Sequence, residues 1–135
     1  MTKVSMSTDL GVSADKVWTL IGGFNSLPDW DPDVEKSVLE NGGRVRRLSI
    51  KGGGTILERL ESIDDEARAC TYTILDGPLP VRNYRATLKV IGKGKACKVE
   101  WSSEFDPVGN EADASAVIRG VYEAGLSSLR RIFAA

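Results

Sequence analysis

Histidine is absent from this 135-residue sequence. Its absence excludes the Ser–His and Cys–His catalytic units, in which an imidazole takes the proton of the nucleophile. It also excludes the common zinc sites that use histidine ligands, so we expect no metal site and no cofactor. A surplus of one sign of charge is lacking too, because 18 Lys and Arg residues stand against 19 Asp and Glu residues. The formal net charge of −1 gives no general attraction for nucleic acid, and we expect no such partner.

Cysteine is scarce, with only Cys70 and Cys97 in the chain. In an up-and-down sheet these two residues would lie on strands that are separated by one intervening strand. Two strand spacings are about 9–10 Å, which exceeds the limit of about 7 Å for a disulfide without backbone movement. We therefore expect two free thiols.

Long apolar runs are lacking as well. No segment approaches the roughly 18 consecutive apolar residues that span a membrane, and the N-terminus carries Lys3 without the apolar segment of a signal peptide. We expect no stable membrane insertion and a cytoplasmic location. Apolar residues make up 41% and charged residues 27% of the chain. These values and the length suit a single soluble domain over 1–135.

The pattern of apolar residues predicts one strand, two helices, six strands and one long helix. The first strand is expected over 3–8. Ser13 is a good N-cap for a short helix that ends at Gly22 and Gly23, and a second short helix is expected within 24–33. Six strands follow at 34–39, 44–50, 55–63, 67–75, 82–91 and 95–105, separated by turn residues. We predict an α+β fold in which a curved seven-stranded antiparallel sheet wraps round the last helix.

The predicted last helix covers 112–133. Small residues occur along it where a core helix favours Leu or Ile, among them Gly120 and Gly125. Small side chains either let the sheet approach closely or leave a void, and the sequence leaves both alternatives open. The apolar residues recur with the spacing of one helical face; they are Ala114, Val117, Ile118, Val121, Gly125, Leu129 and Ile132.

Period-two alternation assigns the strand side chains to two faces. It brings Arg46 inward beside Leu48, and it brings Glu58 inward beside Ile56. In the last three strands, the residues predicted to face the long helix are Cys70, Tyr72 and Ile74, then Tyr84, Ala86, Leu88 and Val90, and finally Cys97, Val99, Trp101, Ser103 and Phe105.

A carboxylate on such an apolar face must be paired, hydrogen-bonded or hydrated. Three explanations of Glu58 remain open. It forms a structural ion pair with Arg46, or it faces solvent because the register is the reverse of the one above, or it projects into a hydrated cavity.

Several stretches in their order and spacing indicate a family. They are Val17, Trp18 and Phe24; Trp30 and Pro32; Glu58, Arg59 and Leu60 with Asp64 and Asp65; Asn83, Tyr84 and Arg85; and 120–129 of the last helix. Over the whole chain the sequence resembles the START-like superfamily, which has the birch-pollen-allergen or helix-grip fold. More narrowly it is similar to the bacterial polyketide cyclase/dehydrase and lipid-transport branch, and its middle part is similar to the plant abscisic acid receptors.

This resemblance implies an internal cavity for an apolar small molecule between the sheet and the last helix, entered past the loops 51–54 and 77–81. It favours the cavity explanation of Glu58, because Glu58 and Tyr84 match positions that the receptors use in ligand contact. The residues expected to contact a ligand are Trp30, Arg46, Glu58, Tyr72, Leu79, Val81, Tyr84, Trp101, Val117 and Val121.

Two departures separate the chain from the receptors. Asp31 stands where the receptors hold the carboxylate of their ligand with a lysine, and an acid repels such a group. Their Ser-Gly-Leu-Pro-Ala gate is replaced here by Lys51 and three glycines. The glycines suit a pliant lid, and they suit an ordinary hairpin turn equally well.

Three functions follow from these observations. The first is binding of a hydrophobic small molecule, which is lipid-like, isoprenoid or aromatic. The second is a cyclase/dehydratase-type enzyme for a polyketide-like substrate, with Glu58 as general acid/base and Tyr84 as a hydrogen-bond donor. In that enzyme Arg46 would either hold an anionic group or tune the pKa of Glu58. The third is a protein-contact surface at the entrance loops, and a homodimer is left open. We place binding ahead of catalysis, because histidine, a metal-ligand cluster and a strong nucleophile are all missing.

Overall fold

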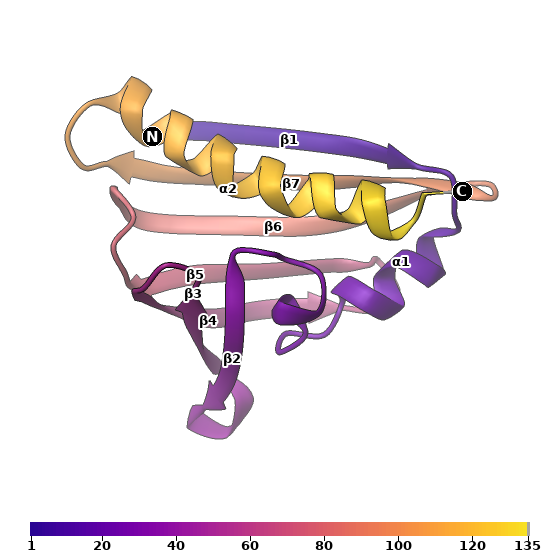
Figure 1. Ribbon diagram of the computed structural model, residues 1–135, viewed down its shortest axis with the longest axis horizontal. Helices are drawn as coiled ribbons and strands as arrows, with labels where there is room; N and C mark the ends of the chain where they lie inside the picture. The colour runs from indigo at the N-terminus through magenta and orange to yellow at the C-terminus, as the bar shows by residue number, and fades with distance from the viewer. Residues whose placement is uncertain (135) are drawn as a thin grey trace.

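Seven antiparallel strands form one sheet in the spatial order β1-β7-β6-β5-β4-β3-β2 in the computed structural model, which describes residues 1–134 (Figure 1). The predicted order of elements and the α+β fold class are confirmed. In chain order the elements are β1 (Thr2–Leu10), α1 (Ala14–Ile21), the 3₁₀ turn η1 (Leu27–Asp29), β2 (Val34–Glu40), the 3₁₀ turn η2 (Asn41–Gly43), β3 (Val45–Ile50), β4 (Thr55–Asp64), β5 (Ala69–Asp76), β6 (Val81–Lys93), β7 (Ala96–Pro107) and α2 (Glu111–Ile132).

The long helix α2 lies across one face of the sheet and packs against β1 and β7. Figure 1 shows that the sheet curls, so that β2 at its far edge crosses the direction of β6. Irregular pairing accompanies the curl, with register shifts at β2, at two places in the β4–β5 pair and in β6. Such bulges increase local twist and bend a strand. The curled sheet therefore encloses a core between itself and α2.

The short elements after β1 follow from their caps. Ser13 accepts a hydrogen bond from the backbone N–H of Lys16 (3.3 Å), and Gly22 caps the other end of α1. The second predicted helix is only the single turn η1, with Pro28 in its first turn. Proline suits the start of a helix but lacks the N–H that a longer helix needs.

The predicted alternation of side chains is confirmed. Arg46 and Glu58 are directly paired across β3 and β4, and both are buried on the inner face. Cys70 on β5 and Cys97 on β7 are separated by β6, and both are buried free thiols, as expected. The reversed register, which would have exposed Glu58, is therefore excluded.

The prediction of which α2 residues face the sheet is wrong in part. Val117 and Ile132 are 42% and 47% exposed, whereas Tyr122 and Leu126 are fully buried. Val117 lies about 100° round the helix axis from the buried Ile118, at the margin of the packed face. Tyr122 is missing from an apolar pattern because its hydroxyl makes it polar, yet its ring belongs to the core.

The two glycines of α2 have different surroundings. A Cβ atom added at Gly125 would lie 2.7 Å from Trp101 Cζ3 and 3.1 Å from Trp30 Cζ3. Gly125 therefore permits the close approach that was one of the two alternatives. A Cβ atom at Gly120 would meet nothing within 4 Å, because Gly120 is exposed. Neither glycine is responsible for a void.

Candidate functional site

A cavity of about 160 Å³ lies between the inner face of the sheet, α2 and the segment 27–34. Its wall is mostly apolar, and every strand except β1 contributes to the wall. The lining residues are Leu27, Asp31, Asp33, Val34, Leu48, Ile50, Lys51, Ile56, Glu58, Tyr72, Ile74, Leu79, Tyr84, Trp101, Ile118 and Val121.

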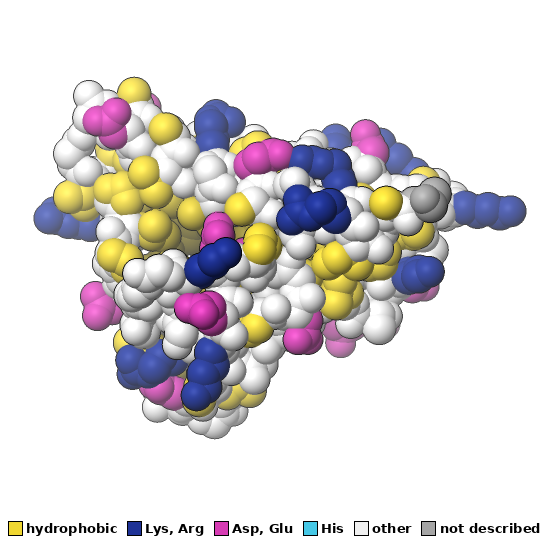
Figure 2. All heavy atoms as spheres, in the orientation of Figure 1, with side chains coloured by type: hydrophobic (Ala, Val, Ile, Leu, Met, Phe, Trp, Pro, Cys, Tyr) yellow, Lys and Arg dark blue, Asp and Glu magenta, His cyan; other side chains and the backbone are white. Residues whose placement is uncertain are grey.

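Two loops predicted to form the entrance do border this cavity, through Lys51 and Leu79. The loops approach one another, since a Cβ atom added at Gly54 would lie 3.8 Å from Pro78 Cγ. Gly52, Gly53 and Gly54 all have left-handed φ values, between 87° and 111°, which favour glycine. In Figure 2, hydrophobic side chains surround a hollow between the first turns of α2 and the β5–β6 loop.

Arg46 and Glu58 form a buried ion pair beside the cavity. Arg46 Nε and Nη2 donate to Glu58 Oε1 at 2.9 and 2.7 Å, and Arg46 Nη1 donates to the carbonyl oxygen of Phe24 at 2.6 Å. The Arg46 guanidinium also lies 4.3 Å from the centre of the Phe24 ring. Burial raises the pKa of Glu58, and the charge of Arg46 opposes the rise. Two of the three explanations of Glu58 hold together, because the residue is ion-paired and also lines the cavity.

Asp31 is a second buried carboxyl on the same wall, with only 3% of its surface exposed. Its Oδ1 accepts a hydrogen bond from the backbone N–H of Asp33 at 3.0 Å. Among residues 1–134, no Lys or Arg nitrogen lies within ion-pair distance of it. Burial, aided by the charges of Asp33 and Glu58, raises the pKa of Asp31 from 3.8 to about 6.

Aromatic side chains form the wall nearest β5, β6 and β7. The hydroxyls of Tyr84 and Tyr122 are hydrogen-bonded to each other, and Trp101 Nε1 donates to Tyr72 Oη at 3.0 Å. Burial raises the pKa of Tyr72 and of Tyr84 well above 10, so both stay protonated at neutral pH. Because the hydroxyl and indole N–H groups of these rings are already hydrogen-bonded, the rings are held in place and form a rigid wall.

The predicted contact residues fall into three groups. The first group lines the cavity and consists of Glu58, Tyr72, Leu79, Tyr84, Trp101 and Val121. Trp30 and Arg46 lie behind its wall, beside a void of only 10 Å³. Val117 and Val81 do not line it: Val117 is exposed one helical turn before Val121, and Val81 lies at a separate slit.

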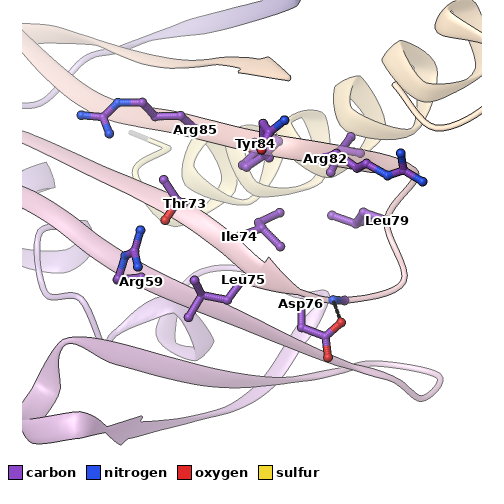
Figure 3. Close-up of a pocket in the computed structure, with 12 residues that line it drawn as sticks. Arg59, Thr73, Ile74, Leu75, Asp76, Leu79, Arg82, Tyr84 and Arg85 are labelled. Atoms are coloured by element: carbon purple, nitrogen blue, oxygen red, sulfur yellow. Dashed lines mark hydrogen bonds between the residues drawn. The ribbon is translucent and has the colours of Figure 1, made fainter. Parts of the chain in front are cut away.

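The slit lies between β5 and β6, which pair only as far as Thr73 and Arg85. Beyond that point the strands separate and leave an opening of about 620 Å³. Figure 3 shows Ile74 and Leu79 between the β5 and β6 ribbons, with Tyr84 close by. These three residues line both the slit and the cavity, so their side chains form a partition between the two.

Asp31, Leu48, Ile56 and Ile118 line the cavity but were not among the predicted contacts. The sequence pattern had already assigned Leu48, Ile56 and Ile118 to the inner face, so their contact with the cavity could have been predicted. The only sequence signal for Asp31 was that it is an acid at the position where the abscisic acid receptors have a lysine. Among residues 1–134, His, Cys, Asp and Glu side chains do not gather in a group of three that could hold a metal ion. No helix in the same range has the length and apolar character needed to cross a membrane.

A family model described as polyketide cyclase / dehydrase and lipid transport matches residues 1–134. The chain therefore belongs to this family, and the resemblance inferred from the sequence is confirmed. MLP-like protein 423 of Arabidopsis thaliana is 31% identical over 119 residues, which cover 78% of this chain and 77% of that protein. The abscisic acid receptor PYL2 of the same plant is 30% identical over 84 residues, which cover 57% of this chain and 44% of the receptor.

Solved structures have the same fold. The protein XoxI of Bacillus cereus is similar with a TM-score of 0.96 and 43% identity, over 98% of this chain and 96% of that one. A START superfamily protein of Mycobacterium smegmatis has a TM-score of 0.74 at 14% identity, over 97% of this chain and 96% of that one. At that identity the likeness concerns the fold alone.

Proposed function

We propose that the protein binds an apolar small molecule in the cavity between the sheet and α2. The observation that carries this proposal is the cavity itself, whose apolar wall includes the polar ends of Asp31 and Glu58. Ligand sites in proteins combine an apolar enclosure with a few fixed polar groups in this way. Family membership and the partial match to an abscisic acid receptor support the same function.

The proposal can be tested with a neutral probe, 2-phenylethanol, titrated by calorimetry. Val121→Phe places a ring on the cavity wall and should weaken binding by about tenfold or more. Val117→Phe is the matched control, because the same change one turn earlier stands on an exposed position. It should leave the affinity within about twofold of the wild type. Equal affinity in all three proteins, or no binding to the wild type, would contradict the proposal.

A second candidate is an enzyme of the cyclase/dehydratase type, and the position of Glu58 favours it. The carboxyl lines the cavity, and burial raises its pKa while the charge of Arg46 opposes the rise. A carboxyl placed beside a bound substrate can act as a general acid or base. In this function Glu58 removes a proton from carbon beside a substrate carbonyl, and Tyr84 serves the carbonyl as a donor. Tyr84 must then exchange its bond to Tyr122 for one to the substrate.

Phenylacetone in D₂O provides a test that needs no known substrate. If Glu58 is a base, the wild type accelerates the exchange of the protons beside the carbonyl, and Glu58→Gln abolishes the acceleration while ligand affinity stays unchanged. The measurement is proton NMR of phenylacetone over time. Exchange that is equally fast with and without protein would exclude this candidate for small ketones.

A further inference from the structure

We propose that the ligand of this cavity is a small amine whose ammonium group binds at Asp31. The apolar part, a single ring or a short chain, would lie among Leu48, Ile56 and Ile118. This inference rests on the proposed function, since it names the chemical class of the molecule that the cavity takes.

The size of the cavity limits the apolar part. A cavity of about 160 Å³ is close to the volume of about 150 Å³ at which an apolar protein cavity binds benzene. One six-membered ring with a short arm therefore fills it. A fused-ring polyketide or a long acyl chain would require the wall to move apart.

Arg46 is not available to an incoming anion. Its Nε and Nη2 atoms donate to Glu58, and its Nη1 atom donates to Phe24. The guanidinium does not line the cavity, and its charge is matched by that of Glu58. A ligand carboxylate would therefore find no free cation inside the cavity, and Lys51 lines it only as an exposed residue at the entrance.

Asp31, in contrast, has capacity left for a hydrogen-bond donor. Only Oδ1 receives a hydrogen bond, from the N–H of Asp33, and a carboxylate can accept about four. The carboxyl of Asp33 lines the same space and adds to its negative potential, whereas the charge of Glu58 is matched by that of Arg46. The lining rings of Tyr72, Tyr84 and Trp101 offer further attraction, because aromatic faces bind cations.

Charge and size together select the ligand class. An ammonium donates to Asp31 and gains from the neighbouring carboxyl of Asp33 and from the rings. An alcohol gains only the hydrogen bond, and an anion is repelled. The order of affinity expected for three molecules with the same ring and two-carbon arm is 2-phenylethylamine, then 2-phenylethanol, then phenylacetate.

Binding of the amine should also depend on pH. The groups that face the cavity are Asp31, Asp33, Glu58, Lys51, Tyr72 and Tyr84, with Arg46 behind Glu58. The pKa of Asp31 lies within the working range, at about 6. The amine keeps its charge throughout, so its affinity should rise as the pH increases from about 5 to about 7.5, while the affinity of the alcohol should change little.

The experiment is calorimetric titration of the wild type, Asp31→Asn and Asp33→Asn with the three probes. Asp31→Asn removes the charge but keeps an oxygen for the N–H of Asp33. It should weaken amine binding about tenfold or more, and should leave the alcohol within about twofold. Asp33→Asn is the matched control at an exposed carboxyl on the same wall. It should weaken the amine by less than Asp31→Asn does.

The outcomes distinguish failure of the amine inference from failure of the proposed function, which is binding of a small molecule in the cavity. If the alcohol binds but the amine does not, or if Asp31→Asn leaves the amine affinity unchanged, the amine inference is overturned and cavity binding stands. Tightest binding of phenylacetate would overturn it in the same way. If none of the three probes binds, the proposed function fails together with the inference.

Discussion

Asp31 is a carboxyl that the folded protein holds in an unfavourable environment. Burial outweighs the hydrogen bond from Asp33, and the charges of Asp33 and Glu58 add to the cost of ionisation. A buried carboxyl whose surroundings disfavour its charged form reduces the stability of the folded protein. Such groups are frequent at binding and catalytic sites. At the scale of residues, Asp31 therefore connects the stability of the fold with the proposed ligand.

The cost of ionising Asp31 should make the free energy of unfolding depend on pH. The folded-state pKa of Asp31 is about 6, against 3.8 ordinarily, so the folded protein retains a proton that the unfolded chain has lost between these values. The contribution of Asp31 to stability therefore falls as the pH rises from about 4 to about 6.

Asp31→Asn should be more stable than the wild type at about pH 7.5, by on the order of 2–3 kcal/mol, and close to it at about pH 4. Urea unfolding of both proteins at the two pH values measures the difference. A loss of stability that is equal at both pH values would show that the carboxylate contributes favourable contacts instead.

Individual residues also show which parts of the site the sequence could predict. The inward position of Glu58 follows from alternation alone, because a strand has only two faces. Whether its partner Arg46 was close enough to pair required the register between β3 and β4, which depends on both strands together. The burial of Asp31 depends on how the irregular segment 27–34 packs, and no periodic pattern describes such a segment.

At the scale of elements, α2 fixes one wall of the cavity, and its contact with the sheet depends on one glycine. Gly125 lies against Trp101 and Trp30, whereas Gly120 faces open space. The spacing of apolar residues predicted the helix and most of its buried face. It could not predict the burial of Tyr122, or which glycine permits close approach, because both depend on the opposing rings.

The two glycines make a matched pair of variants. Gly120→Ala should stabilise the protein by about 0.5–1 kcal/mol, since alanine is the better helix former and its methyl group meets nothing. Gly125→Ala should destabilise it by about 1–3 kcal/mol, because a methyl group 2.7 Å from Trp101 forces the ring to move. Thermal unfolding measures both. Equal effects of the two changes would contradict the close contact of α2 with the tryptophans.

At the scale of the whole molecule, the curl of the sheet is what makes room for a ligand. The sheet, α2 and the segment 27–34 come together round an enclosed space, and the loops 51–54 and 77–80 border its entrance. The family resemblance predicted this arrangement, but the volume and the charge of the cavity depend on the packing of particular side chains. These two quantities are the basis on which we propose a small ligand with a positive charge.

The central claim is that a small molecule binds inside this cavity. Intermolecular NOEs between 2-phenylethanol and the methyl groups of the protein test it most directly. The account predicts NOEs from the ring to the methyl groups of Leu48, Ile56 and Ile118, which line the cavity. NOEs only to exposed methyl groups, such as those of Val38, Leu39 and Ile63, would place the probe on the surface and contradict the account.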